Sequence, residues 1–151
     1  MAVSRAKRMQ VVLTLAVRQE DESAKKLSQF RDQLAQEQRQ LEELRDYAAQ
    51  YLQAQGALRQ GVLAHELINY SSFINRLNEA CREQEAKVAR FLAIQENLLQ
   101  HWRSKHQKRI SIQDLINRLE REDNLLLEKR LQKELDELTS QQLQRQSDAI
   151  P

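Results

Sequence analysis

The segment Gly56-Ala57-Leu58-Arg59-Gln60-Gly61 carries both glycines of this 151-residue chain. The one proline, Pro151, is the last residue. Glycine and proline are the residues that most reliably interrupt a helix. The sequence on either side of this segment therefore contains nothing that stops a helix. A single break between two long helical stretches predicts a helical hairpin.

The composition favours long helices with a solvated surface. Charged residues make up 30% of the chain and aromatic residues 5%, so a large compact core is not expected. Most of the remainder is Leu, Ala and Gln, which are good helix formers. The 24 basic and 22 acidic residues are intermixed and give a net charge of only +2. This balance provides no general case for binding nucleic acid.

The N-terminal region predicts a helix of a cytoplasmic protein and not a targeting segment. Basic residues precede the apolar run from Val11 to Val17, as in a signal peptide, but charged residues follow it without a small-residue cleavage site. The run is also shorter than the roughly 20 apolar residues that a membrane span needs. The single cysteine, Cys81, excludes an internal disulfide and suits a reducing compartment.

Residues at alternating spacings of three and four form the a/d pattern of a coiled coil in both halves of the chain. In the first half they are Met9, Leu13, Ala16, Glu20, Ser23, Leu27, Phe30, Leu34, Glu37, Leu41, Leu44, Ala48 and Tyr51. In the second half they are Tyr70, Ile74, Leu77, Cys81, Gln84, Val88, Phe91, Gln95, Leu98 and Trp102. The fold class predicted is all-α, an antiparallel two-helix coiled-coil hairpin with a longer, overhanging second helix. We expect one domain over 1–151, with a first helix at about 3–55, an apex loop at about 56–66 and a second helix at about 67–145.

The register of the two helices follows from the position of the turn. In an antiparallel pair, facing residues have numbers with a nearly constant sum, here near 121. Polar layers that meet across a seam can fix such a register, although stray polar residues are also common in coiled coils. The expected pairs are Tyr51 with Tyr70, Leu44 with Leu77, Glu37 with Gln84, Phe30 with Phe91, Glu20 with His101 and Met9 with Ile112.

The second helix outlasts the first in this register. The first helix runs out near Arg5, so residues after about Leu119 have no partner within the chain. At about 1.5 Å per residue, this overhang is roughly 30–40 Å of helix. A helix that carries unpartnered leucines usually docks on another surface, and self-association or fraying are the alternatives. The leucines concerned are Leu125, Leu126, Leu127, Leu131, Leu135, Leu138 and Leu143.

Motifs for catalysis or cofactor binding are missing. His65-Glu66 begins like a zinc-protease motif, but Asn69 stands in place of the second histidine. Cys81 occupies a seam position, where a small buried side chain needs no catalytic role. We therefore expect no catalytic residue, no metal and no cofactor. A basic cluster beside Trp102 is read as a solvated helix face rather than as a nucleic-acid site; it contains Arg103, Lys105, His106, Lys108 and Arg109.

Two segments resemble the family of the flagellar export protein FliJ. They are Leu41-Glu42-Glu43-Leu44-Arg45-Asp46-Tyr47, followed by Tyr51, and Ile68-Asn69-Tyr70-Ser71-Ser72-Phe73-Ile74-Asn75-Arg76-Leu77. Trp102-Arg103, Lys105 and the chain length agree with this resemblance. The resemblance implies a two-helix coiled coil similar to the central γ stalk of rotary ATPases. It also implies that this chain is not itself an enzyme.

The resemblance also implies partners and a location. The end that carries both termini would insert into the hexameric export ATPase FliI. The family also contacts the export-gate protein FlhA and empty export chaperones, and it links ATP hydrolysis to proton-driven export in flagellum biogenesis and motility. The protein would then be cytoplasmic and peripheral to the inner membrane at the flagellar base. The alternatives are the stalk protein of a virulence-type secretion ATPase and a nucleic-acid-binding coiled coil.

Two sets of site residues follow. The resemblance places an FlhA-binding surface near the apex, at Gln40, Leu44, Tyr47, Tyr51, Phe73, Leu77, Ala80 and Gln84. Of these, Gln84 stands where relatives carry a histidine, and Leu44 and Leu77 are also seam residues. The overhang and the basic N-terminus predict an ATPase-facing tip made of Arg5, Arg8, Met9, Val12, Leu13, Leu126, Leu127, Leu131 and Leu135.

Overall fold

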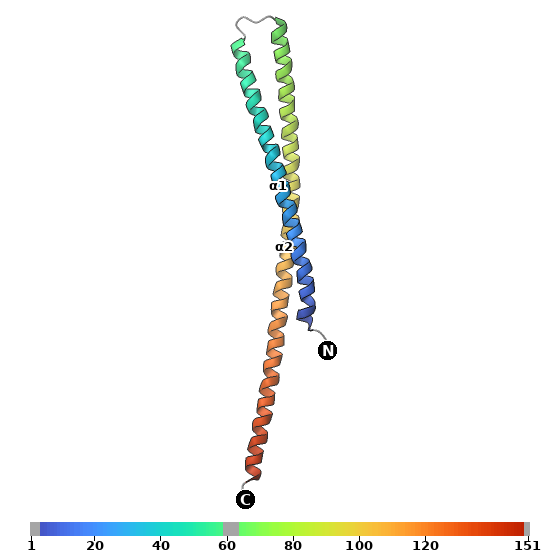
Figure 1. The fold of residues 1–151 in the computed structure, drawn as a ribbon, viewed down its shortest axis with the longest axis vertical. Coiled ribbons are helices and arrows are strands. Elements are labelled where there is room, and N and C mark those ends of the chain that lie inside the picture. The colour runs from blue at the N-terminus through green and yellow to red at the C-terminus, as the bar shows by residue number, and fades with distance from the viewer. Residues whose placement is uncertain (1–3, 59–63, 150–151) are drawn as a thin grey trace. The chain divides into compact units, whose positions relative to one another are not determined.

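The computed structural model describes residues 4–58 and 64–149, which form two helices. Helix α1 spans Arg5–Leu58 and helix α2 spans Ala64–Asp148 (Figure 1). No strand occurs within the described residues, and the two helices pack against each other. The predicted all-α helical hairpin is therefore confirmed. The expected apex segment around Gly61 lies outside the described residues, as does the expected first residue of the first helix, Val3.

Helix α1 begins at Arg5 because Ser4 caps it. The Lys7 backbone N–H donates to Ser4 Oγ at 3.3 Å, and the Arg8 N–H donates to the Ser4 carbonyl at 3.1 Å. A serine hydroxyl in this position satisfies one of the N–H groups that have no partner inside the helix. The cap thus sets the start of α1 ahead of the basic residues of its first turns.

Helix α1 continues past the expected end at Gln55, through Gly56 to Leu58. A glycine inside a helix costs about 1 kcal/mol relative to alanine. A side chain at Gly56 would meet no atom within 4 Å, so close packing does not require the glycine. Helix α2 likewise begins before the expected residue 67, at Ala64, and ends at Asp148.

The chain divides into two compact units. The apical unit contains residues 21–104, and the terminal unit contains residues 1–20 and 105–151. Each unit holds a segment of α1 and a segment of α2 that pack together (Figure 1). The two units are described separately below.

The core of the apical unit is the predicted seam. Leu34, Leu41 and Val88 form a buried cluster, and Phe91 packs against it. The rings of Phe30 and Phe91 lie 5.1 Å apart, so their expected pairing is confirmed. Lys87 Nζ lies over the Phe91 ring, 5.7 Å from its centroid. Other buried seam residues of this unit are Ser23, Leu27, Ala48, Ile74 and Cys81.

The core of the terminal unit is built from small residues of α1 and isoleucines of α2. Ala16, Ile112 and Ile116 form a buried cluster, with Met9 and Leu13 packed against it. Ile116 is fully buried, because the short Ala16 side chain leaves room for it. Met9, which was expected near Ile112, thus packs against the cluster that contains this residue.

The C-terminal segment of α2 carries the overhang. From residue 120 to residue 149 every described residue is exposed, whereas Leu119 is still buried. The seven leucines between Leu125 and Leu143 are 51–62% exposed. Within the terminal unit, α2 therefore extends beyond the residues that α1 covers, as predicted (Figure 1).

Candidate functional site

An aromatic cluster lies at the apex end of the apical unit. The Tyr51 ring contacts three others, with centroid distances of 5.1 Å to Tyr47, 5.7 Å to Tyr70 and 4.9 Å to Phe73. The Tyr70 hydroxyl donates a hydrogen bond to the Tyr51 carbonyl at 3.1 Å. The expected pairing of Tyr51 with Tyr70 is thereby confirmed. Tilted ring pairs at such distances are favourable beyond the area they bury.

Part of this aromatic cluster faces outward. Tyr47 is 50% exposed and Phe73 is 39% exposed, whereas Tyr51 is half-buried beneath them. A shallow hollow beside Tyr47 is lined by Gln40, Glu43 and Leu44. Exposed aromatic rings held by a packed neighbour are the kind of anchor found at binding hot spots. The cluster is therefore a candidate binding surface of the apical unit.

Within the cluster, the pKa of Tyr51 is raised. The main cause is its side-chain hydrogen bond with Tyr47, followed by the charge that an ionised Tyr47 would carry. Burial and Tyr70 add to the same effect. These contacts therefore favour the neutral phenol of Tyr51 over its phenolate.

The residues expected to bind FlhA fall into two groups. Gln40, Tyr47, Tyr51 and Phe73 lie in or beside the aromatic cluster and its hollow. The others are half-buried along the seam: Leu44, Leu77, Ala80 and Gln84. Leu44 belongs to both groups, because it also lines the hollow.

Gln84 is held in a polar layer of the seam. Its Nε2 donates to the Glu37 carbonyl at 3.0 Å and to Glu37 Oε2 at 2.6 Å. Lys87 Nζ lies 3.0 Å from Glu37 Oε1. The expected Glu37–Gln84 pairing is confirmed, and the layer joins the two helices in this register.

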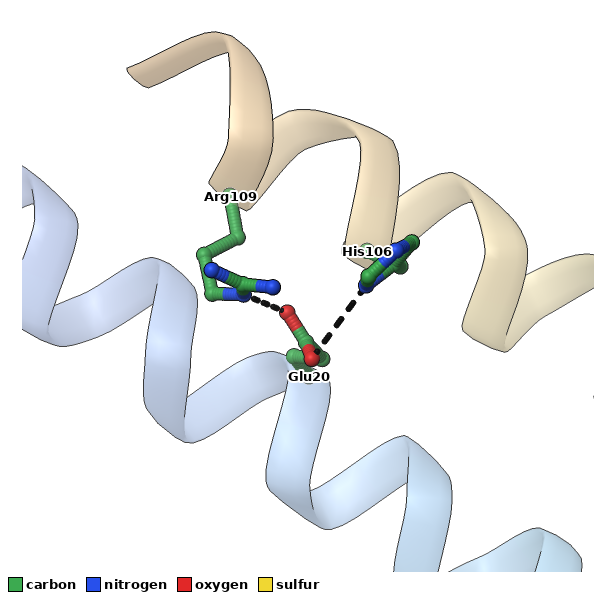
Figure 2. A network of polar contacts seen from close by, with 3 residues as sticks. All are labelled: Glu20, His106 and Arg109. Atoms are coloured by element: carbon green, nitrogen blue, oxygen red, sulfur yellow. Dashed lines mark hydrogen bonds and ion pairs between the residues drawn. The ribbon is translucent and has the colours of Figure 1, made fainter. Parts of the chain in front are cut away.

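A second polar contact joins the helices of the terminal unit, and here the sequence prediction was wrong. Glu20 was expected to face His101, but it binds Arg109 and His106, whose Nδ1 lies 3.4 Å from Glu20 Oε1 (Figure 2). Side chains lean toward the N-terminus of their own helix. In an antiparallel pair this leaning brings a long side chain of α1 to residues later in α2. His106 and Arg109 were both assigned to a solvated basic cluster, yet their spacing of three places them on one helix face.

Both seam glutamates have a lowered pKa. For Glu20, burial opposes ionisation, but the hydrogen bonds and charges of Arg109 and His106 outweigh it. For Glu37, the hydrogen bond from Gln84 is the largest cause, followed by the hydrogen bond from Lys87. The folded state therefore favours the ionised form of both carboxyl groups.

These shifts predict how the stability of the fold depends on pH. A carboxyl group whose pKa is lower in the folded state stabilises the fold above its unfolded pKa, about 4.3, and this contribution disappears as the pH falls through the folded pKa. We expect the free energy of unfolding to decrease on acidification from about pH 5 to pH 3, and to decrease less in Glu20→Gln/Glu37→Gln. Urea unfolding across this range measures the difference. The exposed Glu22→Gln is the matched control, and equal pH dependence in parent and double variant would contradict the assignment.

The residues expected at the ATPase-facing tip are divided between core and surface. Met9 and Leu13 pack against the buried cluster of the terminal unit, so the seam already uses them. Val12 is 40% exposed, and Arg5 and Arg8 are exposed. The leucines of the tip are more than half exposed: Leu126, Leu127, Leu131 and Leu135.

The described residues contain neither a cluster of metal-ligating side chains nor a membrane-spanning helix. Within residues 4–58 and 64–149, no three His, Cys, Asp or Glu side chains group as metal ligands. Cys81 is a free, buried thiol in the seam. Neither helix, over its described length, has a stretch that is long and apolar enough to cross a bilayer.

These features define a class, a coiled-coil hairpin protein with exposed apolar surfaces in each of its two units. A family model described as "Flagellar FliJ protein" matches residues 5–148 of the chain. The chain therefore belongs to the flagellar FliJ protein family, a component of the flagellar protein export apparatus. Searches among curated proteins and among solved structures gave no significant match.

Proposed function

We propose that this protein is the central-stalk adaptor of the flagellar type III export ATPase. In this proposal its terminal unit engages the FliI hexamer, its apical unit contacts the gate protein FlhA, and it takes part in handling export chaperones. It acts in the cytoplasm, peripheral to the inner membrane at the flagellar base, and catalyses no reaction itself. Membership of the flagellar family favours this role over that of a virulence-type stalk.

The single observation that carries the proposal is the exposed leucine stripe of α2, which we define as Leu127, Leu131, Leu135 and Leu138. These side chains recur at spacings of four, four and three, so they share one helix face. Each is more than half exposed, and every described residue after 119 is exposed. An exposed apolar stripe of this length marks an interaction site.

A stalk of this kind would act by differential contact. A helix pair inside a ring stabilises those ring conformations with which it makes the better contacts, and it disfavours the others. In this proposal its effect appears as faster hexamer assembly and faster hydrolysis by the ATPase. The apical aromatic cluster would meanwhile remain available to the gate.

A pull-down of purified FliI with the immobilised chain tests the proposal. We expect the parent to retain FliI and Leu131→Gln/Leu135→Gln to retain at least about tenfold less, since each buried leucine contributes about 1.5–3 kcal/mol. The matched control is Ile68→Gln, because Ile68 is 67% exposed and lies in the apical unit. Equal retention by the parent and the double variant would exclude the leucine stripe as the ATPase contact.

A further inference from the structure

The N-terminal segment of α1 has two apolar faces, of which the seam uses only one. Met9, Leu13 and Ala16 pack on the isoleucines of α2. The other face, here called the outer face, contains Val11 at 74% exposure, Leu15 at 56% and Val12 at 40%. At about 100° per residue, Val11 and Leu15 lie on the side of the helix opposite the seam. The core of the chain therefore leaves the outer face unused.

The residues of α1 that rim the outer face are all basic, and one of them, Lys7, also lines a hollow with Glu120 and Asp123 of α2. Lys7, Arg8 and Arg18 flank the outer face along the helix, and all three are exposed. No acidic residue occurs between residues 4 and 19, because the first one along the chain is Glu20. An apolar patch rimmed by one sign of charge fits a partner whose apolar stripe is rimmed by the opposite charge.

The chain itself contains such a stripe. Glu128 and Glu134 lie on either side of the leucine stripe of α2, and both are exposed. Between residues 120 and 148 there are eight acidic and five basic residues, so this segment has a net charge of −3. The stripe from Leu127 to Leu138 and the outer face with its basic rim from Lys7 to Arg18 each span 12 residues, so their lengths match.

We propose that the outer face of α1 is occupied by the leucine stripe of a second copy of this chain. A two-fold axis perpendicular to the helices reverses the partner, so the α2 of one copy runs in the same direction as the α1 of the other. The leucine stripe of each copy then packs on the outer face of the other copy, so two equal contacts form. This symmetric dimer buries both the outer face and the leucine stripe of each copy. Neither surface is then free to bind a third copy.

The spacing of the side chains fixes the register of this contact. Val11 and Leu15 are four residues apart, as are Leu131 and Leu135. When Leu131 lies opposite Val11, Leu135 lies opposite Leu15. The same register places Glu128 opposite Arg8, so the apolar and the ionic contacts agree.

This pairing goes beyond the proposed function and is tested on the isolated chain. Because the leucine stripe is also the proposed ATPase contact, a chain paired with a second copy would not be free to enter the ring. The pairing experiment contains no FliI, so a monomeric result would leave the ATPase assignment untouched. Conversely, a failed FliI pull-down would leave the pairing untouched.

Sedimentation equilibrium across the micromolar range is the first test. We expect a monomer–dimer equilibrium for the parent, and a dissociation constant at least about tenfold higher for Val11→Gln/Leu15→Gln, because apolar burial is lost at both contacts. Leu52→Gln is the control, since Leu52 is 51% exposed and lies in the apical unit. Arg8→Glu and Glu128→Arg should each weaken the dimer, and combining them should restore it.

Cysteine crosslinking tests the register. With Cys81→Ser in the background, Leu15→Cys and Leu135→Cys are made in separate chains and mixed under oxidising conditions. We expect a crosslinked dimer from the mixture and much less from either chain alone. A parent that stays monomeric would overturn the proposal, as would a dimer that survives Val11→Gln/Leu15→Gln. A monomer that binds anionic phospholipid vesicles through the outer face would also overturn it and would assign that face to a membrane surface.

Discussion

Truncation of the chain after Glu120 is expected to abolish stimulation of the export ATPase and of its hexamer assembly. The truncation removes the whole leucine stripe, which the proposed function places against the ATPase. It removes no core residue, because every described residue beyond Glu120 is exposed. Ile112, Ile116 and Leu119 all remain to close the terminal unit. The fold should therefore survive, and circular dichroism should show no loss of helix beyond the deleted residues.

The informative comparison is two assays on the same truncated protein. Binding to FlhA should persist, because the aromatic cluster belongs to the apical unit and loses no contact. Loss of both activities would indicate that the truncated chain has unfolded, which the dichroism spectrum reports independently. Full ATPase stimulation by the truncated chain would show that the segment after Glu120 is dispensable and would move the ATPase contact elsewhere.

The sequence predicted the helical hairpin because two independent signals agree. The two glycines allow only one break in the helical chain. The spacing of three and four then identifies the buried face of the helix on each side of this break. Residues placed on the seam for this reason, from Met9 to Trp102, are all buried or half-buried. The register also followed from the turn, since Phe30 meets Phe91 and Glu37 meets Gln84. These features depend on backbone geometry, which a periodic sequence largely determines.

The partners in the polar contacts beside the seam could not be predicted from the seam register. Arg45 binds Glu85 at 3.0 Å, and Gln55 donates to Ser71 at 3.0 Å. Like the contact of Glu20, both pairs join an α1 residue to a residue later in α2 than the seam register predicts. The cause is again that side chains lean toward the N-terminus of their own helix, and long side chains extend the offset. The constant sum of facing residue numbers describes backbone positions only. It does not include the length and direction of the side chains.

The candidate surfaces stay predictions, and the structure divides their residues between core and surface. Met9 and Leu13, expected at the ATPase-facing tip, pack in the core of the terminal unit, to which the seam phase also assigns them. The seam spacing also places Val11 and Leu15 on the face of α1 opposite the seam. Their exposure could therefore have been predicted from the sequence. For the aromatic cluster, the resemblance named Tyr47, Tyr51 and Phe73 together. Only the structure shows that the half-buried Tyr51 ring contacts both of the exposed rings.

Replacement of Tyr47 and Phe73 by alanine is expected to weaken binding to FlhA while the helices remain intact. Both rings are exposed enough that their loss should cost less stability than the roughly 3–5 kcal/mol of a fully buried aromatic. As anchors of an interface, they should each contribute about 2 kcal/mol or more, which is roughly thirtyfold in affinity. Titration calorimetry with purified FlhA cytoplasmic domain measures this loss, and circular dichroism checks the helices.

Two further variants separate binding from support. Leu52→Ala is the matched control, because Leu52 is as exposed as Tyr47 but lies on another side of α1, and it should bind FlhA like the parent. Tyr51→Ala should lower both FlhA binding and the melting temperature, since its ring contacts Tyr47, Tyr70 and Phe73 together. If Tyr47→Ala/Phe73→Ala binds FlhA as tightly as the parent, the aromatic cluster is a plug that closes the seam near the apex. The gate contact would then have to be sought elsewhere along the apical unit.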